Sequence, residues 1–295
     1  MCWIHAGTGN DLGDGTAMIS SARRTMTVLE TIARAGGAIG VTDIARHLGL
    51  QPGTVFRSLA ALEQAGYIAR FQSSSRYVLG PAVNQLRQSL LARFKLRDVS
   101  LPYLRQLAFA TGETVSLNMM VGWYSLRIGA AAGTNDVTSS PPIGVVHELD
   151  RTCAGQAILA FLPEDRLQGY QQWASGLRGN AATRLLTKEL RAARARGFAV
   201  EVAPFAPNRA SIAFPIHGEA GPIAAIAIEG PVLQFDQPHT QSNTDQWTII
   251  VQSLQQVVDG APSEFAGPFT HIAPPCIRLT TASELANPLA PTILP

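Results

Sequence analysis

Apolar positions recur along the first third of the chain with the spacing of short amphipathic helices. Their intervals of three and four residues predict helices over 20–35, 43–48 and 52–65. Thr42 is a residue type that often caps a helix N-terminus, so we expect it to cap the second helix. Gly49 ends that helix and leaves a tight turn before the third. Short helices joined in this way are typical of a helix-turn-helix unit.

Alternating residues predict a β-hairpin directly after the third helix. Its strands are expected over 67–71 and 76–79, and the polar residues 72–75 form its tip. A helix-turn-helix followed by such a hairpin is a winged helix-turn-helix. A helical period resumes over 81–110, where Pro102 is expected to break the stretch into two helices.

Strands and helices are mixed in the remainder of the chain. Strands are predicted over 113–121, 123–129, 198–203, 210–217 and 223–230, and helices over 152–161, 164–173, 186–196 and 240–259. This mixture predicts an α+β domain. The expected organisation is a disordered extension over 1–18, a winged helix-turn-helix domain over 19–80, a linker helix over 81–97, the α+β domain over 98–260 and a Pro-rich tail over 261–295.

Charge is divided unevenly between these domains. The 295-residue chain has a net charge of only +2. Residues 19–97 contain 11 Lys and Arg against three Asp and Glu, a net +8, whereas residues 98–295 carry −4. A basic domain joined to a mildly acidic one is typical of a protein that meets phosphate with one end. We therefore expect double-stranded DNA as a partner.

The polar face of the third helix supplies the candidate DNA-reading residues. Arg57 lies opposite the apolar stripe of that helix, where an Arg can bond a guanine edge or hold a phosphate. Gly53 lets the backbone approach closely, and Arg76 in the hairpin can reach the DNA backbone or the minor groove. The predicted DNA contacts are Arg24, Gln51, Gly53, Thr54, Phe56, Arg57, Ser58 and Arg76.

Other chemistries find little support in the sequence. Cys2, Cys153 and Cys276 have neither the spacing of a zinc site nor that of a disulfide framework, which fits a reducing cytoplasm. No motif places a His as a base beside Cys153, so we expect a small buried Cys rather than a nucleophile. No apolar run approaches the roughly 20 residues of a membrane span. We predict no catalytic residue, no metal site and no cofactor.

Several segments in both domains together resemble one protein family. In the first domain these are Ser21-Ala22-Arg23-Arg24, Thr42-Asp43-Ile44-Ala45, Thr54-Val55-Phe56-Arg57-Ser58-Leu59 and Tyr77-Val78-Leu79-Gly80. In the second they include Asp150-Arg151-Thr152-Cys153-Ala154-Gly155-Gln156, Ser211-Ile212-Ala213-Phe214-Pro215-Ile216 and Ala227-Ile228-Glu229-Gly230. Over roughly residues 20–260 the chain resembles the IclR family of bacterial transcription regulators. The resemblance implies a GAF-like effector-binding second domain, and homodimers that often pair into tetramers.

The resemblance also implies a small-molecule site at the start of the helix over 152–161. Free N–H groups and the positive dipole end of a helix N-terminus favour carboxylates there. The predicted effector contacts are Asn118, Thr152, Cys153, Ala154, Gly155, Glu201, Ser211, Ala227 and Glu229.

The chain departs from the family pattern at several of these positions. Ser211 stands where the family usually has Cys, and Ala227 and Glu229 stand where it usually has two Ser. If Glu201 and Glu229 face inward, they repel a plain dicarboxylate unless an Arg neutralises them; the candidates are Arg127, Arg151 and Arg209. We therefore expect a hydroxylated or amino-substituted acid. The alternative is that Glu229 points into solvent at a strand end.

Three functions are compatible with these patterns. The first is a transcription regulator controlled by a small-molecule effector. The second is an enzyme with a DNA-binding arm that uses Cys153 or the pair Glu201 and Glu229. The third is an architectural DNA-binding protein whose second domain only oligomerises. The lack of a nucleophile paired with a base disfavours the second, and the tight Ala-Gly helix start disfavours the third.

Overall fold

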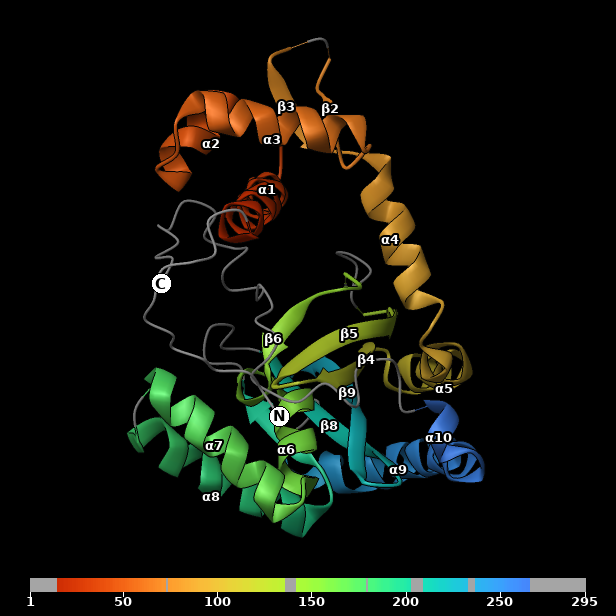
Figure 1. Ribbon diagram of the computed structural model, residues 1–295. Coiled ribbons are helices and arrows are strands. Elements are labelled where there is room, and N and C mark those ends of the chain that lie inside the picture. Colours follow the sequence, from red (N-terminus) through yellow and green to blue (C-terminus); the bar gives the residue numbers. More distant parts are fainter. Residues whose placement is uncertain are drawn as a thin grey trace. The chain divides into compact units, whose positions relative to one another are not determined.

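Figure 1 shows a computed structural model of the chain, which describes residues 15–72, 74–135, 142–178, 180–202, 209–232 and 237–265. The chain divides between Ser89 and Leu90 into two compact units. Each unit has a hydrophobic core of its own, so each is described separately below.

The first unit is a three-helix arrangement with a small sheet. Its helices are α1 (Gly15–Arg34), α2 (Val41–Leu48) and α3 (Pro52–Gln64), and its strands are β1 (Ile39–Gly40), β2 (Ile68–Arg70) and β3 (Arg76–Leu79). The sheet is antiparallel in the order β1-β3-β2. Apolar side chains from every helix form the core, among them Val28, Ile32, Ile44, Val55 and Leu59. The predicted winged helix-turn-helix is present, and β1 adds a strand that was not expected.

Two details of this unit differ from expectation. The helix α1 begins at Gly15, so the last residues of the predicted disordered extension are helical; residues 1–14 lie outside the described part. Thr42 does not cap α2, because the N-cap is Gly40. Gly40 pairs with Arg76 in the sheet, and the chain passes from that strand directly into the helix. Gly49 does end α2, with a left-handed φ of 63°.

The expected helix break at Pro102 is wrong. The helices are α4 (Pro81–Leu91) and α5 (Lys95–Thr111), and Pro102 lies inside α5 on its exposed side. The chain turns instead just before α5, where Leu91 and Phe94 enter the core of the second unit. Burial of these two side chains, which no local pattern reveals, therefore decides where the helix ends.

The second unit is built on a six-stranded antiparallel sheet in the order β6-β5-β4-β9-β8-β7. Its strands are β4 (Thr114–Val121), β5 (Tyr124–Ala131), β6 (Val146–Glu148), β7 (Ala199–Val202), β8 (Arg209–Gly218) and β9 (Gly221–Pro231). Its other helices are the 3-10 turn η1 (Leu149–Arg151), α6 (Cys153–Phe161), α7 (Glu164–Arg178), α8 (Asn180–Arg196), α9 (Gln237–Gly260) and α10 (Pro262–Phe265). The α+β class predicted from the pattern is confirmed.

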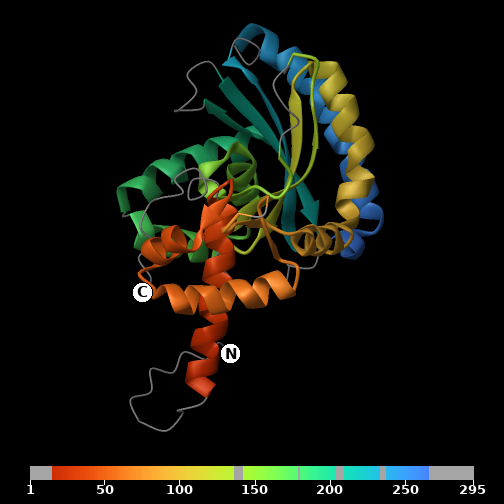
Figure 2. The ribbon, with the colours of Figure 1, turned by 90° about the horizontal axis from the view of Figure 1, so that it is seen from above.

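Helices cover both faces of this sheet (Figure 2). The helices α5 and α9 pack on one face, over a core that includes Leu117, Ile212 and Ile226. The helix α6 packs on the other face with α7 and α8 outside it, over a second core that includes Ala213 and Ala225. Neighbouring strand residues therefore alternate between the two cores.

The predicted Pro-rich tail begins too early. Residues 262–265 form α10, and Phe265 is buried in the core against α5 and α9. A single aromatic side chain at the end of a Pro-containing stretch is enough to bring the backbone onto the core. The rest of the predicted tail, from residue 266, lies outside the described part of the chain.

Candidate nucleic-acid and effector sites

The helix α3 presents one face to the core of its unit and the opposite face to solvent. Gln51 is its N-cap residue and Pro52 its first residue, as the missing N–H of proline allows. Gly53, Phe56 and Arg57 are exposed, and 53% of the Phe56 surface is accessible. An exposed phenylalanine beside an arginine gives this face both an apolar and a cationic contact.

Ser58 does not share this exposed face. It is only 8% exposed, and its hydroxyl accepts a hydrogen bond from Thr25 Oγ1 of α1 at 3.2 Å. Ser58 therefore lies where α1 crosses α3, at the floor of the hollow described next, and its contact with DNA stays a prediction. Its hydroxyl fixes the crossing of the two helices.

A hollow of about 210 Å³ lies between α1 and α3. It brings together four of the predicted DNA contacts, which are Arg24 from α1 and Thr54, Arg57 and Ser58 from α3. Arg57 has no ion-pair partner in the described part of the chain. Two guanidinium groups and a hydroxyl around one hollow form an arrangement that suits a phosphate.

Arg76 lies apart from this hollow, in the wing. It is exposed at the start of β3, next to a turn in which Gln72 has a positive φ of 47°. The neighbouring Arg70 is less free, because it bonds Glu63 at 3.2 Å and lies 5.8 Å from the ring centre of Tyr77. Arg76 is thus the cation that the wing offers to a partner.

The helix α6 begins as its sequence predicts. Thr152 is the N-cap, and its side chain accepts a hydrogen bond from the Gly155 N–H at 3.1 Å. Gly155 also has no room for a side chain, because a Cβ there would collide with the backbone carbonyl of Leu149. Gly155 therefore permits close packing of η1 on α6, and its N–H is already occupied by Thr152.

Cys153 is a buried structural residue, as expected. It is 3% exposed, and its thiol donates to the Ser211 carbonyl oxygen at 3.3 Å. Burial raises the pKa of the Cys153 thiol well above its usual value, and the nearby Glu201 and Glu229 add to the shift. A thiol held protonated in this way is a poor nucleophile.

The sheet brings the predicted effector residues of three strands together on the face that carries α6. Glu201 on β7 lies opposite Ser211 on β8, which in turn lies opposite Glu229 on β9. On the adjacent strand β4, Ser116 lies opposite Ala227. Ala227 is only 3% exposed and belongs to the apolar core below α6.

The alternative in which Glu229 points into solvent is wrong. Arg127 Nη2 donates to Glu229 Oε1 at 2.8 Å, and the two side chains are 16% and 30% exposed. Asn118 joins the same group, because its amide donates to Ser116 Oγ at 3.0 Å, and Ser116 lies 3.5 Å from Glu229 Oε1. Arg127 is therefore the cation that neutralises one of the two glutamates.

Glu201 has no such cationic neighbour among the described residues. Burial raises the pKa of its carboxyl to about 7, with smaller contributions from Glu189 and Glu229, while a hydrogen bond from the Cys153 backbone opposes the shift. On the other side of the group, burial followed by the Arg127 charge lowers the pKa of His147. On this face Glu229 is paired with the Arg127 cation, whereas the Glu201 carboxyl can bind a proton near neutral pH.

Sequence reasoning named Arg127 only as one of three candidates and missed Ser116 and His147. Strand alternation from Asn118 was the available signal for Ser116, since residues two apart share a face. Nothing local indicates His147, which reaches the group through the pairing of β6 with β5. Within the described residues, no cluster of three His, Cys, Asp or Glu is arranged to hold a metal ion.

None of the helices in the described part of the chain combines the length and apolar character needed to span a bilayer.

Two family models match the chain in sequence. The IclR helix-turn-helix domain matches residues 21–70, and the bacterial transcriptional regulator IclR C-terminal domain matches residues 88–255.

Full-length relatives agree with these matches. The glycerol operon regulatory protein of Streptomyces griseus is 29% identical over 217 residues, which cover 72% of this chain and 85% of that protein. The crystal structure of the Thermotoga maritima IclR has a TM-score of 0.65 at 24% identity, over 81% of this chain and 99% of that one.

A further structure, an IclR homolog from Microbacterium hydrocarbonoxydans complexed with 4-hydroxybenzoate, has a TM-score of 0.64 at 19% identity. The match covers 80% of this chain and 99% of the Microbacterium chain. These structures share the helix-turn-helix and the GAF-like α+β domain. Since the two family models between them match most of the described residues, the chain belongs to the IclR family of bacterial transcriptional regulators.

Proposed function

We propose that the protein binds operator DNA through α3 and the wing, and that a small molecule held on the α6 face of the sheet controls this binding. The observation that carries the DNA contact is the hollow between α1 and α3, where Arg24, Thr54 and Arg57 converge. In this proposal one of the arginines holds a phosphate at the hollow while the exposed end of α3, with Phe56, faces the base edges. Arg76 contacts the DNA backbone beside it.

Substitution of Arg57 tests the DNA contact. Arg57→Ala is expected to weaken operator binding by about tenfold or more, since an arginine contact contributes about 1–3 kcal/mol per half-site. Gel shifts with the genomic operator fragment measure the change, and circular dichroism checks the fold. The matched control is Arg87→Ala, an exposed arginine on α4 outside the hollow. Equal affinities of wild type and Arg57→Ala would remove α3 from the DNA-reading surface.

The charges on the α6 face favour one class of effector. Arg127 neutralises Glu229, and its Nε atom is buried without a hydrogen-bond partner in the described residues, so it offers a donor to a ligand oxygen. Glu201 and Ser211 offer acceptors on the other side. We infer a ligand with a carboxylate at one end and a hydroxyl or amine at the other. The 4-hydroxybenzoate bound by the Microbacterium homolog has both features.

Calorimetry on the full chain tests this ligand class. We expect 4-hydroxybenzoate and 4-aminobenzoate to bind more tightly than succinate, which carries a charge at each end and meets Glu201 with one of them. Glu201→Gln is expected to weaken the binding of 4-aminobenzoate. The difference in affinity between 4-aminobenzoate and succinate should therefore become smaller. Tight binding of succinate by the wild type, unchanged in Glu201→Gln, contradicts the proposed site.

The proposal also covers the cellular location of the protein, its oligomeric state and its lack of a catalytic role. The protein works in the cytoplasm, where its DNA partner lies, and it acts as a homodimer or a dimer of dimers. It has no catalytic role, because the Cys153 thiol is held protonated and Glu229 is paired with Arg127. Light scattering measures the oligomeric state directly.

A further inference from the structure

The exposed side of α3 carries one large apolar side chain. Phe56 has 53% of its surface accessible and lies outside the apolar core that the described residues of the first unit form. Its neighbours on the exposed helix surface, Gly53 three residues before it and Ala60 four residues after it, are both small. A Cβ at Gly53 would meet nothing within 4 Å, so the turn of α3 just before Phe56 is open to a partner.

Phe56 and the hollow lie on different sides of α3. The residues of α3 that line the hollow are Thr54, Arg57, Ser58 and Ala61. Because successive residues are about 100° apart around a helix, Phe56 lies about 150° from the middle of this row. Gly53 and Ala60 fall between the two sides, where their small size lets the helix approach the base pairs closely. A phosphate held at the hollow therefore leaves Phe56 on the other flank of the helix, within the groove.

The major groove offers a phenyl ring one apolar partner. Guanine, adenine and cytosine present mainly hydrogen-bond donors and acceptors there, whereas thymine also presents its C5-methyl group. Contact between a ring and this methyl group removes apolar surface of both from water, which favours binding. A long side chain on a helix also leans toward the helix N-terminus, and the N-terminal residues of a recognition helix are those that contact base edges.

We propose that Phe56 selects a thymine at one position of each operator half-site, by packing its ring on the C5-methyl group of that base. This inference rests on the proposed function, since it requires α3 to lie in the major groove. A 5-methylcytosine presents the same methyl group to the groove, so Phe56 also accepts that base in preference to cytosine. In this arrangement Arg57 supplies charge and Phe56 supplies base selection.

Gel shifts with the full-length protein and synthetic duplexes of the genomic operator fragment test the proposal. Each thymine is replaced in turn by deoxyuridine, which still pairs with adenine and lacks only the methyl group. We expect one position in each half-site at which the wild type binds about fourfold more weakly, the effect of one buried methyl group. At that position 5-methylcytosine should bind more tightly than cytosine.

Variants of Phe56 assign this methyl dependence to the ring. Phe56→Ala is expected to bind the thymine and deoxyuridine duplexes equally, and Phe56→Leu to keep part of the difference. The matched control is Phe109→Ala, the same change at a phenylalanine of α5 that is 87% exposed, and it should keep the full wild-type difference. Circular dichroism checks the fold of each variant. The deoxyuridine series uses the wild-type protein, so it remains decisive if Phe56→Ala fails to fold.

Two results overturn the inference. The first is a wild-type protein that binds every deoxyuridine duplex as tightly as the parent duplex. The second is a folded Phe56→Ala that keeps the wild-type loss of affinity at the sensitive thymine. If either occurs while Arg57→Ala still weakens operator binding, only the role of Phe56 is refuted. If Arg57→Ala leaves operator binding unchanged, the proposed function fails, and the inference fails with it.

Discussion

Glu201 and Glu229 flank Ser211 on neighbouring strands and carry the same charge, yet the protein treats them differently. Arg127 contacts Glu229 at 2.8 Å. Glu201 lies half-buried without such a cation, and burial raises the pKa of its carboxyl to about 7. Arg127 pairs with Glu229 only, while burial lets Glu201 hold a proton near neutral pH, so the two glutamates attract different ligand groups.

This difference predicts a pH-dependent stability that depends on Glu201. The folded chain holds a proton on Glu201 that the unfolded chain releases near its ordinary pKa of 4.5. The stabilisation is therefore complete below that value and is lost as the pH rises through about 7. The loss should amount to about 1–2 kcal/mol, because the carboxyl is partly exposed to solvent.

Chemical denaturation of Glu201→Gln and of the wild type at pH 5 and pH 8 measures this effect. The variant should lose less stability between the two values than the wild type. The control is Glu219→Gln in the exposed turn between β8 and β9. An identical pH dependence in Glu201→Gln and the wild type counts against the raised pKa.

At the scale of the element, α6 is buried along almost its whole length. Its residues 153–160 are all buried, between the sheet on one side and α7 and α8 on the other. Its N-terminus is held by the Thr152 cap and by the close approach of η1 at Gly155. A helix buried on every side tolerates little change in position.

Gly155→Ala should therefore destabilise the protein strongly. The added methyl group meets the Leu149 backbone, so η1 and α6 must move apart at an estimated loss of about 2–4 kcal/mol. Thermal and chemical unfolding measure the loss. Gly176→Ala in α7, where a Cβ meets nothing within 4 Å, is the control and should be neutral or stabilising by about 0.5–1 kcal/mol. Equal stabilities of Gly155→Ala and the wild type would show that η1 can shift freely.

At the scale of the whole molecule, charge follows the division into units. The boundary between Ser89 and Leu90 falls close to the point where the basic segment, residues 19–97 with a net charge of +8, gives way to a segment of −4. The positive field is therefore concentrated on the winged helix-turn-helix. Attraction to phosphate comes from this unit, while the second unit is left to bind small molecules.

Operator affinity should accordingly fall steeply with salt. The slope of log K against log salt reflects the cations released from phosphates. Arg57→Ala should reduce its magnitude by about 1 for each phosphate contact removed. Titrations at several salt concentrations measure both slopes. If the Arg57→Ala slope equals that of the wild type while affinity falls, Arg57 contacts a base and not a phosphate; a flat response of both proteins contradicts the electrostatic origin of binding.

The sequence by itself determined those features that depend on local patterns. The helix-turn-helix with its wing, the start of α3 at Pro52, the end of α2 at Gly49 and the presence of a helix beginning near Thr152 all follow from residues within a few positions of one another. Most strands of the second unit were predicted for the same reason, since alternation of apolar residues is local. The placement of Glu201, Ser211 and Glu229 in one row was anticipated only through the family resemblance.

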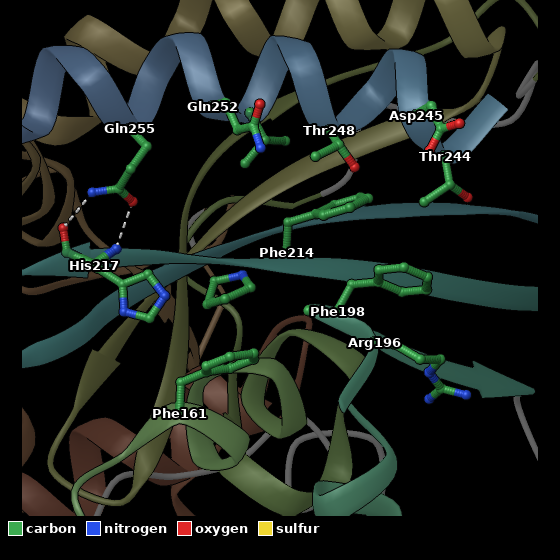
Figure 3. A pocket seen from close by; sticks show the side chains of 13 residues that line it. Phe161, Arg196, Phe198, Phe214, His217, Thr244, Asp245, Thr248, Gln252 and Gln255 are labelled. Carbon is green, nitrogen blue, oxygen red and sulfur yellow. Dashed lines mark hydrogen bonds between the residues drawn. The ribbon is translucent and has the colours of Figure 1, made fainter. Parts of the chain in front are cut away.

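Only the tertiary structure decided what depends on contacts between distant segments. Ser58 is turned inward because α1 crosses α3, and the helix break before α5 follows from burial of Leu91 and Phe94. Arg127 could become the partner of Glu229, 102 residues away, only because β5 and β9 pair with opposite edges of β4. A pocket of about 480 Å³ (Figure 3) is lined by Phe161, Phe214 and Thr248, which lie on α6, β8 and α9 and are far apart in the sequence. Hydrophobic burial and strand pairing act across the fold, so no local period records them.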